Sequence, residues 1–151
     1  MTTVATSRRD FNRDAMASAL AAFAVSATGA QAVAQAPAAG GDASRRQVIR
    51  QLLPDAPERE LILIEVKYPP GTTSPPHLHA NGVMAFVVSG AIASRVDDGP
   101  EQTYRAGDAW WEPPGAVHRV SRNASVTEAA TLLAIFVAPR GASGAALTKP
   151  L

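Results

Sequence analysis

Hydrophobic residues between positions 61 and 137 gather in short stretches, and glycine, proline or aspartate separates most of these stretches from the next. Stretches of about four to eight residues that are rich in β-branched and aromatic side chains, and bounded by turn-forming residues, are typical of β-strands. The pattern therefore predicts strands at 61–66, 83–89, 91–96, 102–105, 109–112, 117–120 and 131–137. Short strands that follow one another so closely indicate a sandwich or a barrel.

Two of these stretches differ in their internal pattern. The segment 61–66 is almost continuously apolar, which predicts a strand buried on both faces. The segment 83–89 alternates, so its side chains are expected to point to opposite faces of a sheet. One face would carry Met84 and Phe86, and the other Val83, Ala85 and Val87.

Two further segments bear on the fold. The segment 45–53 has apolar residues at a helix-like spacing but also fits a short strand, and Pro54 ends either element. The sequence Asp97-Asp98-Gly99-Pro100 predicts a hairpin turn, because Asp and Gly adopt a positive φ at low cost.

The first 36 residues resemble a bacterial twin-arginine signal peptide. Arg8 and Arg9 precede an Ala-rich, weakly apolar run at 15–36, whose alternating alanines offer cleavage sites. The run contains several Ser, Thr and Gln residues and little Leu, Ile or Val, so we expect no stable membrane anchor. The segment is expected to be a disordered or helical signal, and the protein to be periplasmic or secreted.

Length and composition limit the remaining possibilities. The 151 residues predict one domain, here residues 45–151, after a flexible linker at 37–44. A formal net charge of +1 gives no reason to expect a nucleic acid partner. The absence of cysteine excludes disulfides and thiolate metal ligands.

The chain has three histidines, His77, His79 and His118. Residues two apart on a strand project from the same face, so His77 and His79 can approach one point. Three imidazoles suffice to bind an ion such as zinc or iron, and they must be neutral, so binding is expected to weaken below a pH of about 6.5. The alternative is that these are ordinary surface or capping histidines.

The glycines and prolines around the histidines have a specific spacing. Gly71 precedes His77 by five intervening residues, and Gly90 closes the segment seven residues after position 83. In the second segment, five residues lie between Gly107 and Pro113, one lies between Pro113 and Gly115, and two lie between Gly115 and His118. These spacings resemble the two motifs of the cupin superfamily, over residues 60–138. The chain looks most like the small quercetin-dioxygenase-like cupins.

The resemblance implies an all-β fold, the cupin double-stranded β-helix or jelly-roll barrel of two antiparallel sheets. It also implies that one divalent metal ion lies in the barrel mouth, with His77, His79 and His118 as its ligands. Fe(II) is favoured, and Zn, Mn, Ni or Cu are alternatives. Homodimers are common in the family, so a homodimer is expected as well.

One position departs from the motifs. Val83 stands where the first motif usually carries a glutamate ligand, and valine cannot bind metal. Three neutral imidazoles would leave the full charge of the ion, which then favours an anionic or chelating further ligand. Glu112, beside the second motif, is a candidate fourth ligand or general base. The alternative is an outward-facing or salt-bridged residue at a strand end.

Other residues are candidates for the surroundings of the site. Trp110 and Trp111 are expected on opposite faces of their strand, so that one of them can line the barrel. Val83, Ala85 and Val87 would form a small apolar wall suited to a flat hydrophobic ligand. The strand arginines are expected to be solvated, although one could steer an anionic substrate; they are Arg95, Arg105, Arg119 and Arg122.

These features support two main hypotheses for function. The first is a metal-dependent enzyme, most plausibly an Fe(II)-type dioxygenase that acts on a small enolisable or phenolic molecule. The second is a non-catalytic periplasmic cupin that binds a small molecule or a metal at the same site. Zinc-dependent hydrolytic or isomerase chemistry is a weaker third alternative.

Overall fold

The computed structural model describes residues 42–151, most of which lie in β-strands. The strands are β1 (Ser44–Leu53), β2 (Ala56–Tyr68), β3 (Thr73–Ser74), β4 (His77–Leu78), β5 (Val83–Ser89), β6 (Ala91–Val96), β7 (Gln102–Arg105), β8 (Ala109–Glu112), β9 (Val117–Asn123), β10 (Ala130–Pro139) and β11 (Lys149–Pro150). A 3₁₀ turn, η1 (Gly144–Ala146), precedes β11. No helix within residues 42–151 is long and apolar enough to cross a membrane.

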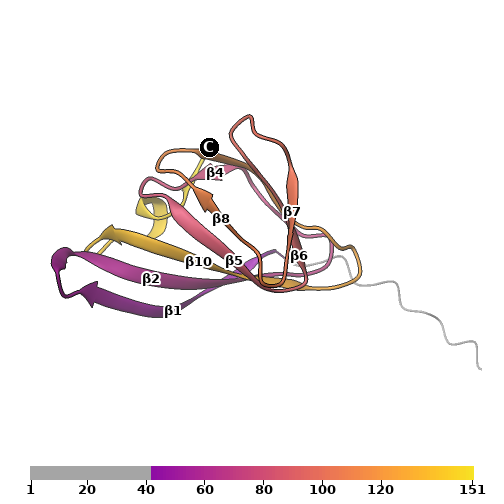
Figure 1. The fold of residues 1–151 in the computed structure, drawn as a ribbon. Helices are drawn as coiled ribbons and strands as arrows, with labels where there is room; N and C mark the ends of the chain where they lie inside the picture. Colours follow the sequence, from indigo (N-terminus) through magenta and orange to yellow (C-terminus); the bar gives the residue numbers. More distant parts are fainter. Residues whose placement is uncertain (1–41) are drawn as a thin grey trace, which may run out of the picture. The chain divides into compact units, whose positions relative to one another are not determined.

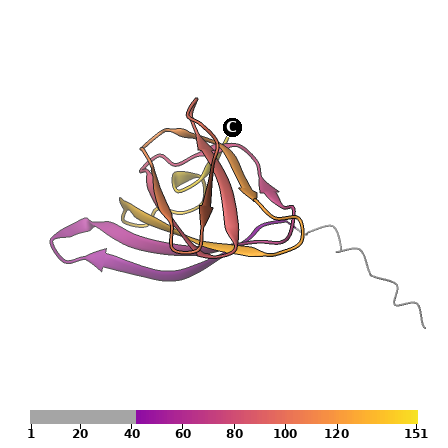
Figure 2. The same ribbon diagram turned by 45° about the vertical axis from the view of Figure 1, so that its right-hand side comes forward.

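The strands form two antiparallel sheets. One sheet has the order β1-β2-β10-β5-β8, and the other has the order β11-β4-β9-β6-β7, with β3 paired to β9. Neighbouring strands are mostly distant in sequence, because the chain passes repeatedly from one sheet to the other. In two views, β1 and β2 form a long hairpin that extends beyond the other strands (Figures 1 and 2). The expected all-β jelly-roll, or double-stranded β-helix, is therefore confirmed.

The core lies between the two sheets and consists of the inward-facing residues of alternating strands. Val66, Val87 and Leu132 of the first sheet pack in one cluster with Ile92 of the second sheet. A second cluster lies beside it and contains Ile62, Val83, Phe136, Ala138, Ala142 and Leu147. Burial of these side chains from water is the main force that holds the two sheets together.

The predicted strands are largely confirmed, and four of them, 83–89, 91–96, 102–105 and 109–112, have the expected bounds. The segment 45–53 is the edge strand β1, paired with β2 from Ser44–Lys67 to Leu53–Ala56, so the helical alternative is wrong. The short strands β3, β4 and β11 were not predicted, because two residues are too few to show a pattern.

One expectation is corrected. The segment 61–66 is buried on one face only: Ile62 and Val66 are buried, whereas Leu61 and Leu63 are partly exposed on the outer face of the sheet. The hairpin turn predicted at 97–100 is confirmed between β6 and β7, and Asp97 adopts a positive φ of 47° there. The signal segment expected at 1–36 and linker residues 37–41 lie outside the described residues.

Candidate metal centre

The backbone brings the three histidines together. His77 in β4 and His118 in β9 are direct cross-strand partners, and His79 follows β4 by one residue. The carbonyl oxygen of His79 accepts hydrogen bonds from the amides of Gly82, at 3.1 Å, and Gly115, at 2.9 Å. The turn after the first histidine pair is thus tied to the Pro-Pro-Gly turn that precedes the third histidine. The expected convergence is confirmed.

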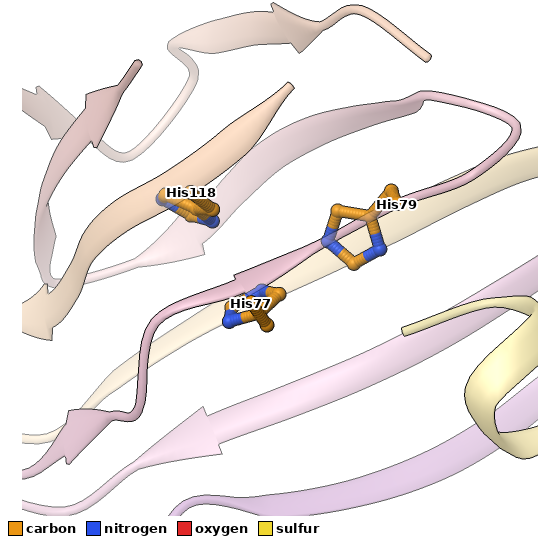
Figure 3. Close-up of side chains that lie close together, drawn as sticks. All are labelled: His77, His79 and His118. Carbon is orange, nitrogen blue, oxygen red and sulfur yellow. The ribbon is translucent and has the colours of Figure 1, made fainter. Parts of the chain in front are cut away.

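The three rings face a common point. The ring centroid of His77 lies 4.9 Å from that of His79 and 5.1 Å from that of His118. One nitrogen from each ring lies within 4.8 Å of the other two, and all three side chains are buried. Figure 3 shows His77 and His79 on one segment and His118 on the adjacent strand. The alternative of surface histidines is wrong, and the cluster can hold a metal ion.

Hydrogen bonds fix which nitrogen each ring presents. The Nδ1 of His77 lies 2.8 Å from the carbonyl oxygen of Pro75, and that of His79 lies 2.7 Å from the carbonyl oxygen of Leu147. A carbonyl can only accept, so both Nδ1 atoms carry the proton and both Nε2 atoms keep a free lone pair. In His118 the Nε2 contacts the hydroxyl of Ser94 at 2.8 Å, which turns its Nδ1 toward Glu112.

Glu112 is buried in this cluster, so the expectation of an outward-facing residue is wrong. Its Oε1 accepts a hydrogen bond from Trp110 Nε1 at 3.0 Å and lies 3.1 Å from His118 Nδ1. Within residues 42–151 its Oε2 has no hydrogen-bond partner, and His79 Nε2 is 3.7 Å away. Buried polar atoms without a partner are rare in proteins. An orphaned carboxylate oxygen beside three imidazoles fits a divalent transition-metal ion.

Burial sets the charge states of these groups. Desolvation lowers the pKa of His79 to about 4 and that of His118 to about 3, and it also lowers the pKa of His77. Desolvation raises the pKa of Glu112 to about 7. The rings are therefore neutral near pH 7, and their contacts with Glu112 are not ion pairs. Protons compete for the imidazoles only at a lower pH than the ordinary histidine pKa predicts.

The cluster lies at the wall of a small cavity of about 40 Å³. Among the expected wall residues, Val83 and Ala85 line this cavity, whereas Val87 packs in the core below it. Further lining residues that the sequence did not single out are Ile64, Tyr68, Ser121, Leu132, Ala134 and Phe136. Trp110 lines the cavity, and Trp111 is 55% exposed, as the predicted alternation requires.

The arginine at the cavity is Arg45 from β1, which the sequence analysis missed. Arg95, Arg105, Arg119 and Arg122 do not line the cavity, and two of them form surface ion pairs, Arg119 with Asp98 and Arg122 with Glu101. Arg45 also lines an adjoining outer pocket of about 400 Å³. Only the pairing of β1 with β2 places Arg45 here, and no local pattern indicates it.

Comparisons with known proteins agree with this arrangement. Residues 64–136 match the cupin domain family Cupin_2. A conserved protein with a double-stranded β-helix domain from Klebsiella pneumoniae subsp. pneumoniae MGH 78578 is 24% identical, with a TM-score of 0.54, over 68% of this chain and 82% of that chain. The protein TT1209 from Thermus thermophilus is 25% identical, with a TM-score of 0.53, over 65% of this chain and 84% of that chain.

KdgF from Halomonas sp. is 22% identical, with a TM-score of 0.52, over 65% of this chain and 79% of that chain. No curated protein matched the sequence. At these identities the solved structures show the fold, and the chemistry must be argued from the site. The family match over residues 64–136, the antiparallel two-sheet topology and the converging histidines together show a small cupin domain in this chain.

Proposed function

We propose that this protein is an exported, metal-dependent enzyme of the oxygenase type that acts on a small enolisable or phenolic molecule. The observation that carries the proposal is the convergence of three buried imidazoles at a cavity with largely apolar walls. Imidazole with a neighbouring carboxylate is a donor set that suits Fe(II), which we favour over Zn, Mn, Ni or Cu. When bound, the ion supplies Lewis acidity and, as Fe(II), one-electron chemistry with dioxygen.

The chain's own residues select the substrate. Val83, Ala85 and Phe136 offer apolar surface to a flat carbon skeleton, and the hydroxyls of Tyr68 and Ser121, 2.7 Å apart, offer hydrogen bonds to its oxygens. An enolate or phenolate oxygen is an anion, and the neutral imidazoles do not cancel the charge of a bound ion. The site therefore favours a substrate that binds as an anion.

The size of the cavity limits how the substrate lies. About 40 Å³ encloses only the reacting end of a molecule, whereas the outer pocket of about 400 Å³ has room for the remainder. The two spaces share lining residues, among them Arg45, Ile64 and Thr148. Arg45 is the cation at this junction, so we expect a second anionic group, such as a carboxylate, on the part of the substrate outside the cavity.

Oxygen uptake by the iron-loaded protein tests this function. The protein is loaded anaerobically with Fe(II), and oxygen consumption is measured with a series of diketones and flavonols. We expect oxygen uptake that depends on both iron and substrate. The His77→Ala variant should lose both the bound metal and this oxygen uptake. Metal content and activity that survive His77→Ala would overturn the proposal.

A second function is favoured by the small volume of the cavity. A site that holds little more than one or two water molecules also suits a cupin that binds a metal or a small anion without turnover. Stoichiometric metal in the purified protein, with no oxygen uptake on any member of the series, would select this alternative.

We also propose that residues 1–36 direct export by the twin-arginine route to the periplasm or beyond. The support is the Arg8-Arg9 pair ahead of the weakly apolar run, as described above. Expression in a bacterial host, followed by cell fractionation, should place a shortened protein outside the cytoplasm. Replacement of both arginines by lysine should retain the full-length chain inside, and a full-length chain in the periplasm would contradict cleavage.

A further inference from the structure

Val83 and Glu112 occupy one position of the same ladder. In the antiparallel pair β5–β8, Val83 lies directly opposite Glu112, and both side chains point into the barrel, where they are 1% and 2% exposed. Side chains opposite each other in such a pair start about 5 Å apart on the same face. A carboxylate on either strand can therefore reach the same part of the interior.

One oxygen of the Glu112 carboxylate is buried without a hydrogen bond from any described residue. Trp110 donates to Oε1 and thereby fixes the plane of the group, while Oε2 is buried and has no partner in the part of the chain that the structure describes. Leaving a buried carboxylate oxygen without a hydrogen bond costs free energy. A purely structural role of Glu112 would therefore not explain why Oε2 is buried.

The distances from Glu112 to the imidazoles are those of atoms that share one ion. Oε1 lies 3.1 Å from His118 Nδ1, and Oε2 lies 3.7 Å from His79 Nε2. Ligand atoms bound to a common ion at about 2.0–2.2 Å are separated from one another by roughly 3–4 Å. Both nitrogens are those that the hydrogen-bond pattern turns toward the cluster.

We propose that Glu112 is a fourth protein ligand of the metal, supplied from β8 in place of the glutamate that Val83 has replaced on β5. The inference rests on the metal site of the proposed function and deepens it. One carboxylate cancels one unit of the ion's charge, so the expectation of three neutral imidazoles alone is replaced by a site of lower net charge. Such a site binds the ion more tightly and leaves room for one substrate anion rather than two.

Exchange of the two residues across the ladder tests the proposal. Zn(II) affinity is measured by competition with a chromogenic chelator, and Co(II) absorption spectra report the ligand set without any need for activity. We expect Glu112→Gln and Glu112→Val to weaken Zn(II) binding at least about tenfold. The double variant Val83→Glu/Glu112→Val returns a carboxylate to the site from β5, and it should restore most of the lost affinity.

The controls separate the possible failures. Glu58→Gln, which removes an exposed carboxylate, should bind like the unaltered protein. If the unaltered protein binds neither metal, the proposed function fails. If it binds, His77→Ala abolishes binding and both Glu112 variants bind normally, only the role of Glu112 is overturned. Should Glu112→Val not fold, Glu112→Gln decides the matter, because it keeps the volume and the acceptor for Trp110.

Discussion

The guanidinium of Arg45, on the edge strand β1, donates a hydrogen bond to the hydroxyl of Ser74 at 3.4 Å and so reaches over the mouth of the cavity. The next residue, Arg46, points to the other side of the strand and pairs with Glu65 at 3.2 Å. The two adjacent arginines thus differ in their surroundings, because Arg45 alone faces the space where substrate would lie. They form a matched pair for testing charge recognition.

We expect Arg45→Met to weaken the binding of a doubly anionic ligand. The probe is 2,4-dioxopentanoate, compared with pentane-2,4-dione, which lacks the carboxylate. Arg45 is exposed, so its contact with a carboxylate contributes about 1 kcal/mol, or roughly fivefold in affinity. Calorimetric titration of the metal-loaded protein should show this loss for the dioxopentanoate alone, and Arg46→Met should leave both affinities unchanged. Equal effects of the two substitutions would show that Arg45 contributes only general charge.

The stability of the metal-free protein should rise between about pH 4 and pH 6.5. The pKa values of His79 and His118 are lowered to about 4 and about 3, and that of His77 is lowered as well. Between these values and 6.5 the unfolded chain binds protons that the folded chain does not, so stability is lost as the pH falls. Urea unfolding over this range should show the trend, and a flat profile would contradict neutral buried rings.

Glu112 should act in the opposite direction. Its folded pKa is about 7 and its ordinary value is 4.5, so its contribution is present at low pH and is lost as the pH rises through 7. Arg45, Tyr68 and the three histidines are the other titratable groups at the cavity. Glu112→Gln should therefore steepen the rise below pH 6.5 and remove the decline above it. An unchanged profile in this variant would show that Glu112 is ionised throughout.

Two glycines of the first motif should differ in their tolerance of alanine. Gly71 and Gly90 have nearly equal φ values of 69° and 71°, in the left-handed region, which costs an alanine about 1–2 kcal/mol. At Gly71 no atom of the described residues lies within 4 Å of an added Cβ, whereas at Gly90 the carbonyl oxygen of Ala129 would lie 2.6 Å away. We expect Gly71→Ala to lower the free energy of unfolding by about 1–2 kcal/mol and Gly90→Ala by about 3–5 kcal/mol. Equal losses in urea unfolding would mean that the loop after β5 yields easily.

Local sequence patterns were sufficient for most of the strands and for the histidine cluster. The bounds of β5 to β8 follow from alternation and turn residues, because both signals lie within each segment. The histidine cluster followed in part from spacing, because His77 and His79 were expected to share a face, and in part from the resemblance to the cupin motifs, which implied that His118 lies beside them. The sequence left open whether 45–53 is a helix or a strand. An edge strand such as β1 has few buried side chains, so its apolar residues do not show a clear alternation.

The sequence could not place residues that meet only through strand order. The register that sets Glu112 opposite Val83 depends on pairing between β5 and β8, and the position of Arg45 depends on pairing between β1 and β2. Neither follows from the period of a single segment. The prediction that 61–66 is buried on both faces was wrong because the leucines on its outer face are as apolar as the core residues beside them. We expect the apolar side chains of this outer face to contact a partner.

That outer face should be covered by a second copy of this chain. A row of apolar side chains in register crosses all five strands of the first sheet: Ile49, Leu63, Ile135, Met84 and Trp111. Phe86 and Val137 extend the row on either side, and both are more than a third exposed. Strands about 4.8 Å apart give this patch an area of roughly 400 Å², the size of the largest apolar patch on a typical monomer, which is often functional.

Two such patches would bury roughly 800 Å² together, below the size of a standard interface, so we expect a weak, concentration-dependent homodimer. Sedimentation velocity over a range of concentrations should show the mass shift from monomer to dimer. Met84→Lys places a charge in the centre of the row, where desolvation opposes association, and should leave a monomer at all concentrations. Val126→Lys is the matched control, because Val126 is 73% exposed on a loop away from the row. A monomer at every concentration without any substitution would mean that another surface, or none, covers this face.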